Sequence, residues 1–286
     1  MSSFLRRFLV PRNDNLGDKK YFYKKLILKT QYLSNSQPQN LSQKKMKYLS
    51  ILLFLILTTS CQITETIHLN PDGSGNIETI AIRDEHSYMQ LSGENYGKEE
   101  KFRDTTYVFQ EYITKYAENF AKLSASEKAI FNQYKDVKVH LKESSFEKEV
   151  KNTFTQNFNK AEDIADLYKT VEYADDLKHN YALSAEEHYY HVSFTFDGTT
   201  FKRIVKITNP TELKKKQDGI EGFKKKTSGF KLVHTLTLEY YFPRKIKSVS
   251  NEKAIISSDK KSLKLVLQLS DCLQNPENAS LEVLLE

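Results

Sequence analysis

The sequence predicts an α+β domain over residues 61–286, in which an antiparallel sheet built from hairpins carries about three helices on one face. Two kinds of pattern lead to this prediction. Several segments alternate apolar and polar residues and are separated by Gly, Pro, Asn or Asp, which is typical of strands joined by turns. Two others repeat apolar residues at the spacing of an amphipathic helix, and a third opens with a helix-capping pattern. Because short turns join antiparallel neighbours, one domain is the simplest arrangement, and two lobes divided near residue 185 are the alternative.

The expected strands pair off along the chain. Residues 63–82 form a hairpin in which Pro71 presets the turn and Gly73 supplies a positive φ. A later hairpin turns at Asp197 and Gly198. The strand-like segments, taken in order, are 63–82, 137–158, 190–207, 232–242, 254–269 and 281–285. Tyr189, Tyr190, Tyr240 and Tyr241 are expected to pack across these strands with their hydroxyls at the rim.

Three helices are expected, over residues 105–123, 124–134 and 159–173. The first and third repeat apolar residues at helical spacing. The second opens with Ser124 and has Glu127 three residues later, which is the capping-box pattern of a helix N-terminus. Residues 84–104 and the Lys-rich residues 210–229 are polar and are expected to be loops.

The charge of the chain is unevenly distributed. Eleven of the 43 Lys and Arg residues but only two of the 37 acids lie in residues 1–60, so residues 61–286 carry a net charge of −3. A mildly acidic domain gives no reason to expect nucleic-acid binding. The lysine triplets at 214–216 and 224–226 are interspersed with acids and predict a solvated loop; contact with an anionic surface is the alternative.

Residues 46–61 have the organisation of a secretory signal. Lys47 follows Met46, an apolar run covers 49–57, and the small residue Ser60 precedes Cys61. The run is too short to cross a bilayer, which takes about 20 apolar residues, but it has the length of a signal-peptide apolar region. A buried apolar helix and an uncleaved signal anchor are the alternatives.

This segment resembles a bacterial lipoprotein signal peptide with its lipobox, with Thr58 where the pattern usually has Leu. The resemblance implies that the thiol of Cys61 is acylated, that residues 46–60 are removed, and that Cys61 becomes the first residue of the mature protein, with palmitate-type chains attached. The Thr/Glu stretch 64–66 and the Asp-Gly-Ser-Gly turn at 72–75 are similar to uncharacterised Bacteroidetes envelope lipoproteins, a resemblance that implies localisation and no activity.

Residues 1–45 are too long and too basic for a signal-peptide leader. We interpret Met46 as the start of the protein and residues 1–45 as upstream sequence translated in error. A genuine extension with a weak helix around residues 21–32 is the alternative.

Motifs with catalytic or metal-binding potential are sparse. His188 and His191 have zinc-ligand spacing on a helix, but they enter a predicted strand, which would put them on opposite faces. The Ser-x-x-Lys matches at 145–148 and 258–261 lie in predicted turns, not at helix starts. Cys272 has no second cysteine left once Cys61 is acylated, and is expected to be a buried small residue. We therefore predict no catalytic residue, no metal and no cofactor.

Together these patterns predict a lipid-anchored envelope lipoprotein that is not an enzyme and acts as a binding or structural module. Its predicted partners are the membrane, through the lipid on Cys61, and an envelope protein, with no nucleic acid. Gln62 follows the cysteine where the enterobacterial sorting rule has Asp for inner-membrane retention, so the outer membrane is expected. A carrier of an apolar ligand or lipid and an enzyme with an unrecognised site are the alternative functions.

Overall fold

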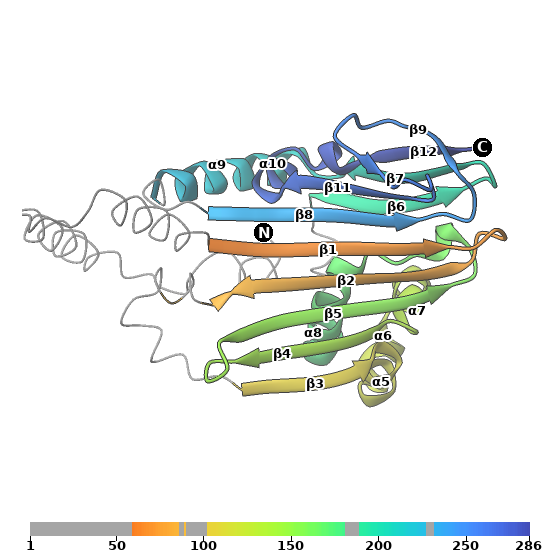
Figure 1. Ribbon diagram of the computed structural model, residues 1–286. Helices are drawn as coiled ribbons and strands as arrows, with labels where there is room; N and C mark the ends of the chain where they lie inside the picture. The colour runs from red at the N-terminus through yellow and green to blue at the C-terminus, as the bar shows by residue number, and fades with distance from the viewer. Residues whose placement is uncertain (1–58, 86–88, 90–101, 181–188, 227–231) are drawn as a thin grey trace, which may run out of the picture. The chain divides into compact units, whose positions relative to one another are not determined.

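A computed structural model describes residues 59–85, 89, 102–180, 189–226 and 232–286 (Figure 1). Strands and helices combine in an α+β fold, as predicted, but the strands form two sheets instead of one. In spatial order the larger sheet consists of β10 (Ile255–Ile256), β11 (Ser262–Gln268), β8 (Leu232–Tyr241), β1 (Thr59–Leu69), β2 (Gly75–Asp84), β5 (Glu149–Phe158), β4 (Lys138–Ser144) and β3 (Phe102–Val108). The smaller sheet consists of β6 (Tyr190–Phe196), β7 (Thr200–Ile207), β12 (Leu281–Leu285) and β9 (Ile246–Val249).

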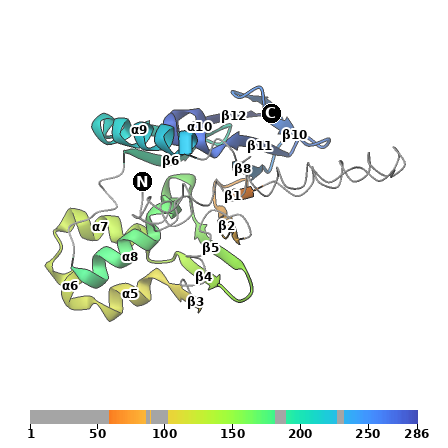
Figure 2. The same ribbon diagram turned by 90° about the vertical axis from the view of Figure 1, so that its left-hand side faces the viewer.

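The described residues form six α-helices, more than the three that were predicted. They are α5 (Phe109–Lys115), α6 (Ala117–Lys122), α7 (Ala125–Tyr134), α8 (Thr170–His179), α9 (Pro210–Lys226) and α10 (Leu269–Gln274), together with the 3₁₀ turns η2 (Ala161–Asp163), η3 (Leu167–Lys169) and η5 (Pro276–Ala279). Figure 2 shows α5 to α8 beside β3, β4 and β5, and α9 and α10 beside the smaller sheet. Nothing in the described segments is a helix both long and apolar enough to cross a membrane.

The predicted hairpins are confirmed. β1 pairs with β2, β4 with β5, β6 with β7, and β10 with β11, all antiparallel. In the first turn the Asp72 carboxylate accepts hydrogen bonds from the Ser74 amide at 3.0 Å and the Ser74 hydroxyl at 2.7 Å. These bonds lower the pKa of Asp72, and Gly73 supplies a φ of 85°. The turn chemistry read from the sequence therefore matches the structure.

The expectation of a wholly antiparallel sheet is wrong at the centre. β1 pairs with β8 in parallel, with Cys61 opposite His234 and Tyr240 opposite Ile67. Parallel neighbours need a long connection, and here most of the chain lies between the two strands. Alternation of side chains identifies each strand but carries no information about which distant strand becomes its neighbour.

Two helix predictions need correction. The segment 105–123 begins as β3, which pairs with β4 up to Val108, and the helix that follows is interrupted at Tyr116 between α5 and α6. The segment 159–173 forms the two short 3₁₀ turns, and the α-helix starts only at Thr170. The apolar side chains that suggested this helix, such as Ile164 and Leu167, are nevertheless buried. The sequence therefore predicted correctly that these side chains are buried, but not that the backbone carrying them forms 3₁₀ turns.

The helix predicted over 124–134 is confirmed as α7. Ser124 Oγ accepts a hydrogen bond from the Glu127 amide at 3.2 Å, and Glu127 Oε2 accepts one from the Ser124 amide at 2.7 Å. This is the reciprocal capping box expected from the sequence.

The Lys-rich segment predicted as a loop forms α9 through Lys226, and residues 227–229 lie outside the described residues. Asn209 caps the helix by accepting a hydrogen bond from the Glu212 amide at 3.0 Å, and Pro210 occupies the first helical position. Lys214 also forms an ion pair with Asp218, four residues later in the helix, at 3.0 Å, and pairs at this spacing stabilise a helix. The predicted loop 84–104 falls largely outside the described residues, and its last three residues belong to β3.

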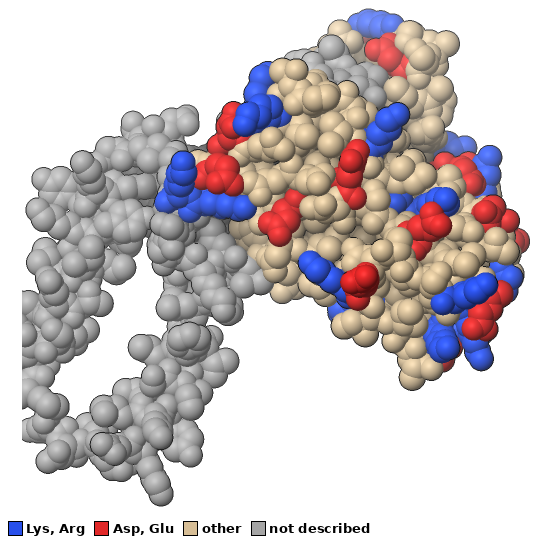
Figure 3. All heavy atoms as spheres, turned by 90° about the horizontal axis from the view of Figure 1, so that it is seen from above, with Lys and Arg blue, Asp and Glu red and all other residues tan. Residues whose placement is uncertain are grey.

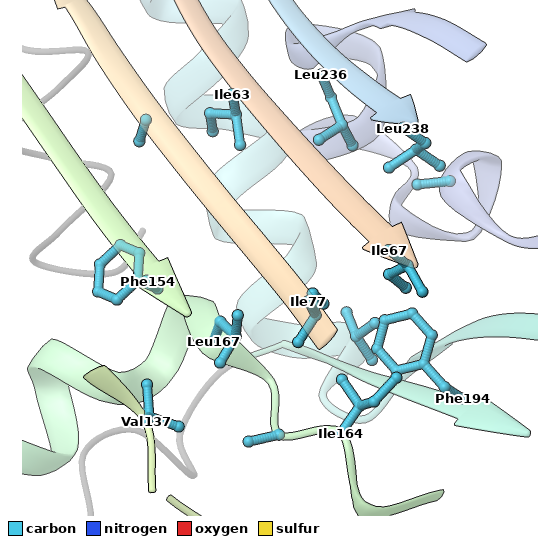
Figure 4. Packing of buried hydrophobic residues seen from close by; sticks show 14 of the residues in the cluster. Ile63, Ile67, Ile77, Val137, Phe154, Ile164, Leu167, Phe194, Leu236 and Leu238 are labelled. Atoms are coloured by element: carbon cyan, nitrogen blue, oxygen red, sulfur yellow. The ribbon is translucent and has the colours of Figure 1, made fainter. Parts of the chain in front are cut away.

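The hydrophobic core covers one face of the larger sheet. Alternate residues of its central strands point into it, among them Ile63, Ile67, Ile77, Phe154, Leu236 and Leu238 (Figure 4). Over β5 the core is covered by helices. The Gln156 side chain of β5 connects the sheet to α7, because its Nε2 donates a hydrogen bond to the Gln133 carbonyl at 3.3 Å. Over β8 it is closed by the smaller sheet, where the rings of Phe201 and Tyr240 are 5.4 Å apart. The prediction that helices alone cover one face of the sheet is thus correct over β5 and wrong over β8, where the smaller sheet covers it.

Two glycines give a matched stability test. A Cβ at Gly75 would overlap the His68 carbonyl oxygen and lie 2.7 Å from the Phe158 ring, whereas one at Gly219, inside α9, would meet nothing within 4 Å. We expect Gly75→Ala to lower the free energy of unfolding by about 1–3 kcal/mol through overpacking. Gly219→Ala should raise it by about 0.5–1 kcal/mol, because alanine favours the helix. Urea denaturation would measure both, and equal effects of the two substitutions would contradict the packing at Gly75.

Candidate functional site

The predicted lipidation residue, Cys61, lies near the beginning of β1, the strand next to the middle of the larger sheet. Its side chain is on the core face and is 5% exposed. Arg83 of β2 and His234 of β8 are its backbone partners on either side. The strand starts two residues earlier, at Thr59. Cys61 therefore belongs to the sheet itself, with no linker between the cysteine and the fold.

A charged cluster adjoins Cys61 at this end of the sheet. Arg83, 7% exposed, pairs through Nε with the Glu85 carboxylate, which is 3% exposed, and its NH2 group lies 3.9 Å from Glu143 Oε1. Ionic groups this well buried are stable only when paired. Next to Cys61 the core therefore ends at a group of charged side chains that pair with one another.

A second buried ionic group lies between the two sheets and was not foreseen. Glu65 of β1 faces Arg203 of β7, and both are 2% exposed. Arg203 donates from Nε to Glu65 Oε1 at 3.0 Å and from NH2 to Oε2 at 3.3 Å. Its NH1 group donates to the Ala279 carbonyl at 3.0 Å, and the Tyr240 hydroxyl donates to Glu65 Oε1 at 2.5 Å. The expectation that the Tyr240 hydroxyl lies at the rim is wrong, because it completes this buried group.

The electrostatics of this group favour its charged form. Burial opposes the charge of Arg203, but the charge and hydrogen bond of Glu65, together with Tyr240 and Tyr168, outweigh that effect and raise the pKa of Arg203 above its usual value. Burial, with the charge of Glu65, raises the pKa of Tyr240 well above 10. Both groups therefore keep their protons at neutral pH. Their interactions join β1, β7 and β8, which is a structural role.

Beside this ionic group is a small cavity lined by Tyr168, Tyr190, Cys272 and apolar neighbours. The Tyr168 hydroxyl is buried without a hydrogen-bond partner in the described structure. The cavity has a volume of about 30 Å³, which is room for a water molecule that could satisfy this hydroxyl. Burial also raises the pKa of the Cys272 thiol to about 11, so Cys272 is the inert buried residue that was expected.

The remaining sequence candidates are not brought together. His191 is exposed on β6, and His188 lies outside the described residues. Residues 145–148 form the turn between β4 and β5, and residues 258–261 lie in the connection from β10 to β11, so neither Ser-x-x-Lys match starts a helix. Where the structure is described, no group of three His, Cys, Asp or Glu side chains could hold a metal ion.

The lysines of α9 are largely matched by acids of the same helix. Lys216 lies 3.1 Å and Lys215 3.2 Å from the Glu212 carboxylate, and Lys224 lies 3.9 Å from the Glu221 carboxylate. Figure 3 shows basic and acidic side chains interspersed over the face seen from above. This pattern supports a solvated, ion-paired helix surface.

Comparisons with known proteins assign no family. No protein-family profile and no curated protein matches the sequence. Among solved structures, the folded domain of the Mycobacterium tuberculosis protein LppM, determined by NMR, aligns with 87% of this chain and 95% of its own chain at 9% sequence identity. The TM-score of 0.34 is too low to support an argument about fold or function. The resemblance of residues 64–75 to Bacteroidetes lipoproteins stays a prediction.

Proposed function

We propose that the chain is a lipoprotein of the bacterial cell envelope, anchored by acyl chains on Cys61, and that its α+β domain is a binding or structural module. The position of Cys61 in β1 carries the proposal. The strand begins at Thr59, so cleavage before Cys61 would remove only two residues of β1. Every side chain of the described core would stay in the mature protein.

The chemistry of the anchor is simple. The thiol of Cys61 displaces the phosphate-bearing headgroup of a phospholipid, so that its sulfur forms a thioether to the diacylglyceryl group and its proton is released. Water then hydrolyses the peptide bond before Cys61, and the new α-amino group takes a third acyl chain from a second phospholipid, which leaves as its lyso form. Each buried CH₂ group contributes about 0.8 kcal/mol, so several chains on one residue anchor a domain stably, whereas one chain does not. Gln62, which is exposed, takes the sorting position next to the lipid, and we propose the outer membrane as the destination.

The interior supports a module better than a carrier. The cavity between the sheets, about 30 Å³ in volume, is far smaller than an acyl chain. Two larger hollows, of about 400 and 350 Å³, are lined largely by polar and charged side chains, which do not suit an apolar ligand. The buried charges of Glu65 and Arg203 are paired with each other, and a paired, enclosed ion pair offers no group for proton transfer to a substrate. We therefore propose a binding or structural role, with an envelope protein as the partner.

The first experiment is intact-mass measurement of the chain made in a bacterial host, wild type beside Cys61→Ser. We expect wild type to begin at Cys61, to carry the mass of the acyl chains, and to fractionate with membranes until detergent is added. Cys61→Ser should lack the lipid mass and should leave the membrane fraction, because serine provides no thiol for acylation.

Cys272→Ala is the matched control, because it removes the other thiol of the chain. This variant should keep both the lipid mass and the membrane association of wild type. An unmodified wild-type chain that still carries residues 1–60 would refute the lipoprotein proposal. Loss of the lipid mass in Cys272→Ala, with the lipid kept in Cys61→Ser, would place the acyl chains on Cys272 and contradict the proposed site.

A further inference from the structure

Two aromatic side chains stand out on the surface of the described residues. Phe146 is 94% exposed and Phe102 is 79% exposed, which makes them the most exposed large apolar side chains of the segments that the structure describes. Phe146 lies in the turn between β4 and β5, and Phe102 is the first residue of β3. Single exposed apolar residues are common on protein surfaces, so the location of this pair is what matters.

Strand register puts both rings at the same end of the sheet as Cys61. Cys61 is opposite Arg83, and Arg83 is opposite Val150, so these three residues are level across β1, β2 and β5. One residue further out, Glu149 pairs with Ser144, which in turn pairs with Phe102. Phe102 is therefore about 3.3 Å beyond the level of Cys61.

The turn at 145–148 projects further in the same direction. Figure 1 shows the starts of β1, β3 and β5 at one end of the larger sheet, where this turn also lies. With neighbouring strands about 4.8 Å apart, the turn is displaced sideways from Cys61 by about 12 Å. Phe102 and the turn that carries Phe146 thus lie beyond the level of Cys61, at the same end of the larger sheet.

We propose that this end of the sheet, defined by Cys61, Phe102 and Phe146 and called here the anchor edge, rests in the lipid bilayer interface with both rings inserted beside the acyl chains. The inference rests on the proposed lipidation of Cys61. Because Cys61 is itself a residue of β1, no flexible linker separates the lipid from the sheet. The lipid and the two inserted rings then form three points of contact, and these hold the domain in one orientation on the membrane.

The contact is apolar in character. Around the turn, Lys142 Nζ lies 2.9 Å from Glu147 and 2.6 Å from Glu149. Lys148 of the same turn supplies a second positive charge, so the two carboxylates are balanced within the protein. Insertion of the rings should then proceed on zwitterionic lipids and persist at high salt. A protein partner that covered the anchor edge would have to displace the bilayer to which Cys61 is attached.

The absence of tryptophan from the sequence makes a direct test available. Phe146→Trp introduces a single tryptophan, which can be excited at wavelengths that the 17 tyrosines do not absorb. The position is too exposed for the substitution to disturb the core. The full chain, matured in a bacterial host, is reconstituted into phosphatidylcholine vesicles whose acyl chains carry bromine. We expect the emission of Phe146→Trp to shift to shorter wavelength and to be quenched by the bromines, and both effects to survive high salt.

Ile255→Trp is the matched control at the opposite end of the sheet. Ile255 of β10 is 69% exposed. It pairs with Lys264 of β11, which pairs with Glu239 of β8, which pairs with Thr66 of β1. Ile255 is therefore level with Thr66, five residues along β1 from Cys61. Its emission should match that of the protein in detergent, without quenching by the bromines.

Intact mass of the same samples separates the possible failures. Lipid on Cys61 with quenching confined to Phe146→Trp supports the anchor edge. Lipid on Cys61 with both fluorophores unquenched, or equally quenched, overturns it while leaving the proposed function in place. Samples without the lipid refute the proposed function and, because membrane contact by the anchor edge depends on that lipid, this inference as well.

Discussion

Replacing Arg203 by methionine is expected to lower the free energy of unfolding by about 3–5 kcal/mol. Arg203 and Glu65 are each 2% exposed and share two hydrogen bonds. Without the guanidinium, the Glu65 carboxylate stays buried with no opposing charge across the interface between the sheets. Urea denaturation followed by circular dichroism measures the loss, in the Cys61→Ser background so that no lipid affects it.

The neighbouring Lys202 supplies the matched control. Its ammonium group lies 2.8 Å from Glu282 on the surface, with the two side chains 43% and 52% exposed. Exposed pairs contribute little to stability, so Lys202→Met should leave the urea midpoint nearly unchanged. Adding Glu65→Gln to Arg203→Met should recover much of the loss, because the unpaired charge is gone. Equal effects of Arg203→Met and Lys202→Met would show that Glu65 and Arg203 are not buried together.

Truncating Phe201 to alanine is expected to cost about 3–5 kcal/mol of unfolding free energy. The ring is 0% exposed and lies 5.4 Å from the ring of Tyr240 and 5.6 Å from that of Phe242, measured between centroids. It connects the smaller sheet to β8, so its removal leaves a cavity where the two sheets meet. Urea denaturation of the Cys61→Ser background reports this loss.

Phe146→Ala removes the same ring from a 94% exposed position and should change stability by no more than about 0.5 kcal/mol in solution. The comparison separates loss of packing from the intrinsic effect of replacing phenylalanine. A loss in Phe201→Ala as small as that in Phe146→Ala would mean that the smaller sheet does not pack on β8.

Strands and hairpins were the part of the fold that local sequence predicts well. The turn with Asp72 and Gly73 depends on hydrogen bonds within a few residues, and so does the Ser124 capping box of α7. Both were read correctly because the atoms that determine them are neighbours in the chain. The Lys-rich α9 was missed because its apolar stripe is weak, although Asn209 and Pro210 were a usable helix-start signal.

The candidate site divides in the same way. Cys61 was predicted as a lipidation site from the apolar segment that precedes it, since a signal-peptide pattern is a contiguous sequence feature, and this stays a prediction. The ionic group of Glu65, Arg203 and Tyr240 was not foreseen, because its members are separated by 138 and 175 residues along the chain. A Glu at an inward-facing position of β1, between Ile63 and Ile67, was the one local sign of it, and it implied no partner.

By itself the sequence determined the secondary-structure class, the hairpins and the cysteine on which the proposed anchor depends, because these follow from residue spacing and short-range hydrogen bonds. Only the tertiary structure decided that β8 lies parallel to β1, that the strands divide into two sheets, and that Phe102 and Phe146 share an end with Cys61. These features arise from long-range pairing, in which the burial of a whole face outweighs local preference.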